Sequence, residues 1–382
     1  MTSGKLKFLM KLRGPMVRLL FCVFFVTTST VFTQRASDGE VQVQKCWEHS
    51  AGSDSLSNLR VFGETIFSIR EGSVVEAIAG DSGKLLWSND VGGTVVSDLV
   101  SDGVSVYFVR RAGGAKGAEP EADLIAISAN SGITRWQRSL GADGDHRLAI
   151  TKTGIVALSD SGSLWVVSSS DGTVTSSRKL ISPVRLGTSV LGVNTIGATN
   201  EREIISIEGS QTPMVRGRSD FAITALRSNG DDELYYGNDR GILVRLDGTS
   251  SKIIWQFKSG GAISDILVAD HQIITSSNDN FVYAFAPYNG ARLWKRRVAG
   301  RVSALRMVGQ DLLLVQPLGD GNIVLINTKN GRIAGQMPFT DGESVIDSAV
   351  IDSNRIVVST GGIIYGYAVG GCPTVKQNGP GM

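Results

Sequence analysis

A hairpin-like unit that recurs about every 40 residues constrains the fold of this chain more than any other feature. In residues 281–298, FVYAFAPYNGARLWKRRV, the side chains of Phe281, Tyr283 and Phe285 alternate with smaller ones, as in a half-buried strand. Asn289-Gly290 then forms a tight-turn pair, and a second extended run containing a tryptophan follows. Because an isolated hairpin is at best marginally stable in water, the unit must pack against copies of itself.

Copies of this unit run through the chain. The whole pattern returns in VVEAIAGDSGKLLW (74–87) and DLIAISANSGITRW (123–136), whereas ILVRLDGTSSKIIW (242–255) keeps the tryptophan but has Ser251 at the turn glycine. Weaker copies at 163–176 and 322–335 keep the turn and lose the tryptophan, and the region of 204–216 fits only by spacing. The tryptophans that anchor the repeat are Trp47, Trp87, Trp136, Trp255 and Trp294.

A period of about 40 residues with four short strands per unit is typical of β-propeller blades. Seven hairpins are predicted at about 73–91, 122–140, 162–180, 202–218, 241–259, 280–298 and 321–339. The eighth pairs 363–369 with an N-terminal outer strand at 41–48, which removes the exposed edges of an open array. The sequence therefore predicts an all-β chain, an eight-bladed β-propeller over residues 38–371, closed by pairing of the N-terminal strand with the last blade.

The sixth unit illustrates the predicted blade. Its strands are expected at 262–268, 272–276, 281–286 and 292–298, from the innermost to the outermost. The anchor tryptophan then lies on the outer strand, between adjacent blades. Since a side chain of this size buries about 150–250 Å², packing is a far commoner role for such a residue than ligand binding.

Residues 1–35 differ in kind from the rest. Five basic residues between Lys5 and Arg18 precede a short apolar run at 19–26 and small polar residues, which indicates an export signal and places the protein in the periplasm or cell envelope. The apolar run is short for a transmembrane helix. An uncleaved membrane anchor is the alternative, because no clean A-x-A site follows.

The apparent basicity of the chain belongs to this N-terminal segment. Six of the 38 basic residues and none of the 36 acidic residues lie in 1–35, so the remainder carries 32 basic against 36 acidic residues. A slightly acidic propeller gives no reason to expect nucleic acid as a partner.

Two cysteines remain after the N-terminal segment, and their positions are informative. Cys46 precedes the first anchor, and Cys372 follows the last predicted strand, so each lies where one end of the propeller should meet the other. In an exported protein such a pair can form a structural disulfide. The alternative is two unrelated buried thiols. Residues 372–382 are expected to form a disordered tail.

The segments AIAGDSGKLLW, AISANSGITRW and AFAPYNGARLW carry a family resemblance. An alanine-containing strand, a turn that ends in glycine and a tryptophan four residues later resemble the PQQ-type tryptophan-docking repeat over about residues 41–371. That family divides into quinoprotein dehydrogenases, which bind pyrroloquinoline quinone, and non-enzymatic eight-bladed propellers of the outer-membrane assembly (BamB) type. The chain resembles the second kind in its size and its export signal, and departs from it in lacking a lipoprotein cysteine.

The enzymatic branch implies features that this sequence lacks. Quinoproteins of the family carry adjacent cysteines, a calcium site of Glu, Asn and Asp, and long loops over the cofactor, whereas here no two cysteines are adjacent. The histidines His49, His146 and His271 lie in different units without metal-ligand spacing. Local turn hydrogen bonds account for the acidic and amide residues Asp81, Asp171, Asn289 and Asn330. The sequence therefore predicts no catalytic residue, no metal and no cofactor.

Two irregularities remain, since function in propellers resides on loops. The loop at 110–123 connects the second and third strands of the second unit and is read as a solvated extension rather than a binding loop. The basic cluster of Arg292, 295–297 and Arg301 is read as a solvated edge that discourages strand addition.

The function predicted from these features is that of a non-catalytic, monomeric, exported scaffold. It would bind protein partners through propeller loops, as in a membrane assembly complex, or add a partner strand to an edge, and would meet the membrane only through a partner or an uncleaved anchor. A PQQ-dependent oxidoreductase and an envelope protein that binds a polymer or sugar are the alternatives.

Overall fold

The structure of this protein is a computed structural model that describes residues 40–52, 55–112, 121–141, 144–191, 194–207, 212–230, 233–319, 322–337, 339 and 344–373. These residues belong to one compact unit, Gly39–Met382. The predicted export signal (1–35), the tip of the predicted loop (113–120) and the tail from 374 onward lie outside the described residues. Within the described ranges no helix has the length and apolarity needed to cross a bilayer.

Short strands separated by tight turns make up the described chain, as the alternation of apolar side chains predicts. Blades 1 to 4 contain β2 (Leu56–Phe62), β3 (Thr65–Arg70), β4 (Val74–Ala79) and β5 (Leu85–Asp90); β6 (Thr94–Val95), β7 (Val100–Ser101), β8 (Ser105–Arg111), β9 (Ala122–Ser128) and β10 (Thr134–Gly141); β11 (His146–Thr151), β12 (Gly154–Ser159), β13 (Ser163–Val167) and β14 (Val174–Lys179); and β15 (Val184–Leu191), β16 (Asn194–Thr199), β17 (Glu203–Ile207) and β18 (Met214–Arg218). Blades 5 to 8 contain β19 (Ile223–Asn229), β20 (Glu233–Asn238), β21 (Ile242–Asp247) and β22 (Ile253–Lys258); β23 (Ile263–Ala269), β24 (Gln272–Ser277), β25 (Phe281–Phe285) and β26 (Arg292–Arg297); β27 (Val302–Val308), β28 (Leu312–Pro317), β29 (Val324–Asn327) and β30 (Ile333–Gln336); and β31 (Asp347–Val350), β32 (Arg355–Ser359), β33 (Ile363–Val369) and β1 (Val43–Ser50).

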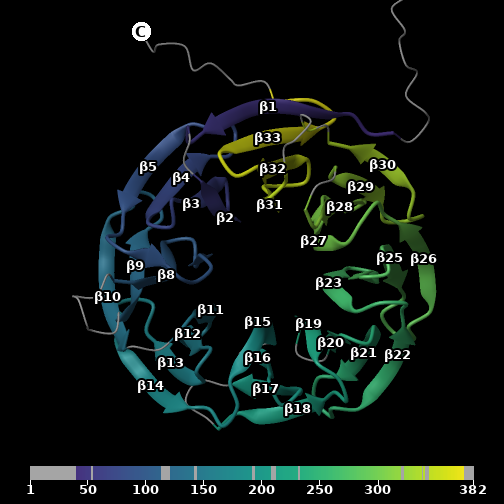
Figure 1. The fold of residues 1–382 in the computed structure, drawn as a ribbon, viewed down its shortest axis with the longest axis horizontal. Helices are drawn as coiled ribbons and strands as arrows, with labels where there is room; N and C mark the ends of the chain where they lie inside the picture. Colours follow the sequence, from purple (N-terminus) through teal and green to yellow (C-terminus); the bar gives the residue numbers. More distant parts are fainter. Residues whose placement is uncertain are drawn as a thin grey trace, which may run out of the picture. The chain divides into compact units, whose positions relative to one another are not determined.

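These strands form eight antiparallel sheets arranged as a ring, with the first strand of each blade at the central opening and the last at the rim (Figure 1). The eight-bladed propeller predicted from the repeat is thus confirmed. In blade 2 the innermost strand is split, since both β6 and β7 pair with β8.

The ring closes through β1, which pairs antiparallel with β33 from Val43 opposite Val369 to Ser50 opposite Ile363. The predicted partner at 363–369 has the observed bounds, whereas the predicted outer strand at 41–48 lies two residues too early. In the structure Val41 instead reaches back to blade 7, where its N–H donates to the carbonyl of Ala334 over 2.6 Å. Residues 41–50 therefore contact two blades, 7 and 8.

The hydrophobic core lies between successive blades, not within a single layer. Alternate residues of each strand face opposite neighbours: Ile204 packs toward blade 5, whereas Ile205 and Ile207 pack toward blade 3. Because every blade buries both faces against its neighbours, its inner strands are apolar on both sides, as in β12, where all six residues are buried.

Candidate functional site

The five anchor tryptophans lie on outermost strands and contact the hairpin turn of the next blade. A Cβ atom added to the turn glycine of that blade would lie less than 3 Å from the indole. These glycines have φ between +68° and +73°, a region that favours glycine on backbone grounds as well. The pairs are Trp47 with Gly83, Trp87 with Gly132, Trp136 with Gly172, Trp255 with Gly290, and Trp294 with Gly331.

Each indole also forms a hydrogen bond across the blade junction. Its Nε1–H donates to the carbonyl three residues before the turn glycine, over 2.6–3.3 Å. The side chain two residues after the tryptophan adds a second contact in four junctions, since His49, Asn89, Arg138 and Arg296 contact the carbonyl of the turn glycine itself. The repeat thus joins the tryptophan of one unit to the glycine of the next.

The size of the residue that pairs with the anchor position on the neighbouring strand depends on whether the anchor is a tryptophan. Ala77, Ala126, Ala284 and Gly366 lie opposite a tryptophan, and only Arg245 is larger among these partners. Where the tryptophan is absent the partner is bulky: Val166 lies opposite Ser176, Ile204 opposite Gly217, and Leu325 opposite Gly335. Close packing explains this exchange, because one side chain fills the space that the other leaves.

Cys46 on β1 and Cys372 after β33 form a disulfide, with a Cα–Cα distance of 5.4 Å and a sequence separation of 326. The bond ties the two ends of the propeller together beside the closing β1–β33 pair. Its position near the rim is remote from the central opening, so its role in the structure is covalent closure.

A second contact of the closing strand depends on pH. Glu76 on β4 is 3 % exposed; its Oε1 accepts from Arg70 Nε over 2.7 Å, and its Oε2 lies 3.8 Å from His49 Nε2 on β1. Burial alone would raise the pKa of the Glu76 carboxyl, but the contacts with His49 and Arg70 outweigh burial and hold this pKa below its ordinary value of 4.5.

A lowered carboxyl pKa contributes stability above the unfolded-state value, and the contribution is lost as the pH falls through the folded-state value. Glu76→Gln should therefore lower the free energy of unfolding at pH 7 by about 1–3 kcal/mol, because the guanidinium of Arg70 loses its charged acceptor. The deficit should shrink below pH 4.5 in urea unfolding curves. Glu48→Gln, which alters an exposed carboxylate of the same strand β1, is the control and should match the wild type at both pH values.

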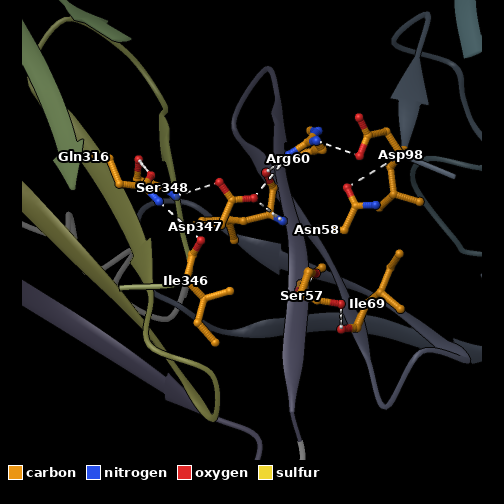
Figure 2. Close-up of polar contacts among 12 residues, drawn as sticks. Ser57, Asn58, Arg60, Ile69, Asp98, Gln316, Ile346, Asp347 and Ser348 are labelled. Carbon is orange, nitrogen blue, oxygen red and sulfur yellow. Dashed lines mark hydrogen bonds and ion pairs between the residues drawn. The ribbon is translucent and has the colours of Figure 1, made fainter. Parts of the chain in front are cut away.

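Charged side chains of the inner strands line the central opening and link neighbouring blades. Figure 2 shows Asp347 of β31 beside β2: its Oδ2 accepts from Leu59 N over 3.1 Å and from Arg60 over 3.2 Å. Arg60 also pairs with Asp98 of blade 2 over 2.8 Å. On its other side, Oδ1 of Asp347 accepts from Arg306 of blade 7 over 3.1 Å. One carboxylate thus joins blades 7, 8 and 1.

The same contacts recur two blades earlier. Oδ2 of Asp265 on β23 accepts from Leu305 N of blade 7 over 3.0 Å, and its Oδ1 lies 3.5 Å from Arg227 of blade 5. Burial raises the pKa of the Asp265 carboxyl above its ordinary value, against the opposing effect of Arg227 and the backbone N–H of Leu305. These carboxylates are structural acceptors that hold blades together.

The inner-strand charges alternate around most of the ring. The innermost segment of blades 1, 3, 5 and 7 carries an arginine, namely Arg60, Arg147, Arg227 and Arg306. The innermost segment of blades 2, 6 and 8 carries an aspartate, namely Asp98, Asp265 and Asp347. Blade 4 breaks the alternation, because Leu186 has the register position there that Asp265 has in blade 6. Arg147 of blade 3 accordingly donates to the backbone carbonyl of Val184 over 3.3 Å, and forms no ion pair within the described residues.

Beside Arg147 lies a cavity of the central channel, lined by residues of blades 1, 2, 3 and 5 and called the channel recess below. The recess has a volume of about 560 Å³, and Arg60, Arg147, Arg227, Asp98 and Asp145 contribute charge to it. Asp98 is paired with Arg60, Asp145 with Arg111 over 3.2 Å, and Arg227 with Asp265. Among the described residues that line the recess, Arg147 therefore remains as the excess positive charge, and the arrangement favours an anionic group such as a carboxylate.

The other residues singled out from the sequence lie apart from one another. At the recess, the ring of His146 packs against that of Trp165 in a tilted arrangement, with centroids 5.6 Å apart, and His271 lies in the turn between β23 and β24. The turn residues Asp171, Asn289 and Asn330 accept from backbone N–H groups two positions on. In the basic cluster, Lys295 lies over the ring of Phe281, 3.6 Å from its centroid.

The residues present do not fit a calcium-bound pyrroloquinoline quinone. Asp265 and Asp347 already accept guanidinium and backbone N–H bonds, and Cys46 and Cys372 are joined near the rim rather than adjacent at the channel. Across the described ranges, no three His, Cys, Asp or Glu residues group closely enough to hold a metal ion.

Comparison with known proteins relates this geometry to a family. The family model described as "Outer membrane protein assembly factor BamB" matches residues 35–206 and 194–371. Two relatives of that name, from Yersinia pestis and Moranella endobia (strain PCIT), are 23% and 22% identical to the chain; the matches cover 85% and 86% of this chain, and 88% and 91% of the relatives.

The solved structure of BamB from Moraxella catarrhalis superimposes with a TM-score of 0.64 at 16% sequence identity, covering 86% of this chain and 100% of that one. At this identity the superposition supports the fold alone. The family model spans both halves of the propeller, with its tryptophan-docking junctions, and on that match this chain belongs to the BamB family of PQQ-type repeat propellers.

Proposed function

We propose that this chain is an exported, non-catalytic scaffold that binds protein partners in the assembly of outer-membrane proteins. The observation that carries the proposal is the family match over nearly the whole propeller, together with relatives of similar extent that are named for this assembly role. The predicted export signal at 1–35 supports a place in the periplasm or cell envelope. The ion pairs of the channel support a structural rather than a catalytic use of its acidic residues.

We infer that the partner binds at the channel recess beside Arg147 of blade 3. Arg147 is the one inner-strand arginine of the described alternation without a carboxylate, and the recess beside it is open. An aspartate or glutamate of a partner would complete the alternation there. A guanidinium pairs well with such a group because its planar donors match a carboxylate.

The test is cross-linking in the cell envelope followed by capture of the full-length protein. We expect outer-membrane assembly proteins among the cross-linked partners, and we expect Arg147→Glu to lower their yield about tenfold through charge repulsion. Lys152→Glu makes the same charge change at an exposed turn of the same blade and should leave the yield unchanged. Equal yields from both variants would refute the recess as the partner site.

A second measurement addresses the oxidoreductase alternative. Adding pyrroloquinoline quinone with calcium should leave the melting temperature unchanged, since a ligand stabilises a protein only by binding its native state. A rise in melting temperature accompanied by substrate oxidation would replace the scaffold proposal by an enzymatic function.

A further inference from the structure

Strand β26, on the outer rim of blade 6, is dense in exposed cations. It contains four basic residues, twice as many as any other outermost strand, and no acidic residue. Arg292, Lys295 and Arg297 are exposed, and within the described residues none of these three forms an ion pair with a carboxylate. The basic cluster that the sequence suggested to be a solvated edge is thus a source of uncompensated positive charge.

The surroundings of β26 do not neutralise this charge. The neighbouring outer strand β22 adds Lys258 and, like β26, has no acidic residue. The acidic residues nearest in the chain on the outer half of these blades are turn residues: Asp279 accepts from the hydroxyl of Tyr283, and Asp247 accepts from backbone N–H groups of its own turn. The rim of blades 5 and 6 is therefore net positive.

Exposed apolar side chains lie at the turn end of the same two strands. On β22, Ile253 and Ile254 are 58 % and 46 % exposed; Leu293 on β26 is 54 % exposed, and Tyr288 in the turn before β26 is 72 % exposed. Trp255 ties that turn to β22, since its Nε1–H donates to the carbonyl of the residue before Tyr288 over 2.7 Å. The four exposed side chains therefore lie close together on one side of the blade junction.

The shape of this surface favours a bilayer over a pocketed partner. Figure 1 shows β22 and β26 as neighbours on the convex outer rim, so their exposed side chains project outward. A bilayer accepts projecting apolar side chains at the level of its head groups without a complementary pocket. Its anionic phosphates attract clustered lysine and arginine, and tyrosine is favoured at the same depth.

We propose that the rim of blades 5 and 6 docks on the surface of a bilayer that contains anionic phospholipid. Ile253, Ile254, Tyr288 and Leu293 would enter the head-group region, and the cations of β26 would lie against the lipid phosphates. The long stems of arginine and lysine allow both contacts at once, because they keep the charge at the phosphates while the apolar residues go deeper. Such docking needs neither a protein partner nor a membrane anchor.

The test is flotation of the purified protein with vesicles of phosphatidylcholine, either alone or with about one third phosphatidylglycerol. Residues 1–35 are themselves basic and partly apolar, so the full chain is compared with residues 36–382, which contain the whole compact unit Gly39–Met382. We expect the shorter form to bind the anionic vesicles at least about tenfold more strongly than the neutral ones. The binding should weaken as salt is added.

A matched pair of variants tests the contribution of charge. Arg292→Glu/Arg297→Glu should lower the affinity for the anionic vesicles by about tenfold or more, because attraction becomes repulsion. Lys84→Glu/Lys152→Glu makes the same change of net charge at exposed residues of blades 1 and 3. This control should change the affinity by less than about twofold, since the charges lie on other blades.

A second pair tests the apolar contact. Ile254→Ser/Leu293→Ser should lower the affinity by about fivefold or more. Its control is Leu86→Ser/Ile133→Ser, at residues of blades 1 and 2 that are 53 % and 69 % exposed, and should bind as the wild type does. Arg147→Glu in the channel should also leave vesicle binding unchanged, so this test and that of the assembly role succeed or fail separately.

Three results would overturn the proposal: equal binding to neutral and anionic vesicles, equal losses in a variant and its control, or a loss that follows the charges alone. A dimer that forms without lipid and dissociates in Ile254→Ser/Leu293→Ser would also overturn it, because the apolar side chains would then contact a second copy of the chain.

Discussion

Replacing Trp294 with alanine should lower the free energy of unfolding by about 3–5 kcal/mol, the range for a buried large aromatic residue. Trp294 is 8 % exposed and packs with Leu313, Val315 and Ile326 of blade 7. Its Nε1–H donates to the carbonyl of Thr328 over 2.6 Å. The variant therefore loses apolar contact and leaves a buried acceptor unpaired. Urea unfolding followed by circular dichroism measures the change.

The matched control is Leu293→Ala on the same strand. Leu293 is 54 % exposed, so its truncation should change stability by less than about 0.5 kcal/mol. Gly331→Ala tests the contact from the other side, because a new Cβ would meet the indole of Trp294 and the backbone there has φ +68°. Its destabilisation should be smaller when Trp294 is already alanine, since only the backbone strain then remains. Additive effects would argue against the docking contact.

Removing the disulfide is expected to have the other large effect. Cys46 and Cys372 are separated by 326 positions, so the bond restrains almost the whole propeller. In the chain-entropy account, closing a loop of this length stabilises the native state by up to about 5 kcal/mol. The variant Cys46→Ser/Cys372→Ser should therefore unfold at a clearly lower urea concentration than the oxidised wild type.

Reduction provides the control for this variant. With a reductant present, the wild type and the double serine variant should have nearly the same midpoint, because both then lack the cross-link. For thiol labelling, the oxidised protein is prepared without residues 1–35, which contain Cys22, and is then unfolded. Labelling should find no reactive cysteine before reduction and two after reduction. Two reactive thiols before reduction would favour the alternative of unrelated cysteines.

The sequence repeat determined the architecture of this protein almost completely. A strand, a turn and an outer strand of fixed length can bury their apolar faces only against neighbouring copies, so the period of about 40 residues leads to blades. The pairing of 363–369 with an N-terminal strand followed from the need to cover open edges. Even the strand bounds of the sixth blade agree with the prediction to within one residue, since period-two alternation is a local property.

The partners of the repeat residues were decided only by the tertiary structure. Glycine and tryptophan four residues apart in one unit look like a pair, yet Gly290 contacts Trp255 of the preceding blade and Trp294 contacts Gly331 of the following one. At one junction Gly217 stands in place of the tryptophan, and Ser251 stands in place of the turn glycine of the next blade. The same explanation applies, because a turn needs no glycine where no indole packs on it. A repeat alone does not tell contacts within a unit from contacts between units.

The candidate sites depend even more on the three-dimensional arrangement. The alternation of Arg60, Asp98 and their counterparts has a period of two blades, about 80 residues, which the stronger 40-residue repeat obscures in the sequence. Its break at Leu186 becomes apparent only once neighbouring blades lie side by side. Local sequence sets which face of each strand is apolar, whereas the charge or cavity left at a junction is a sum over two blades that only their packing brings together.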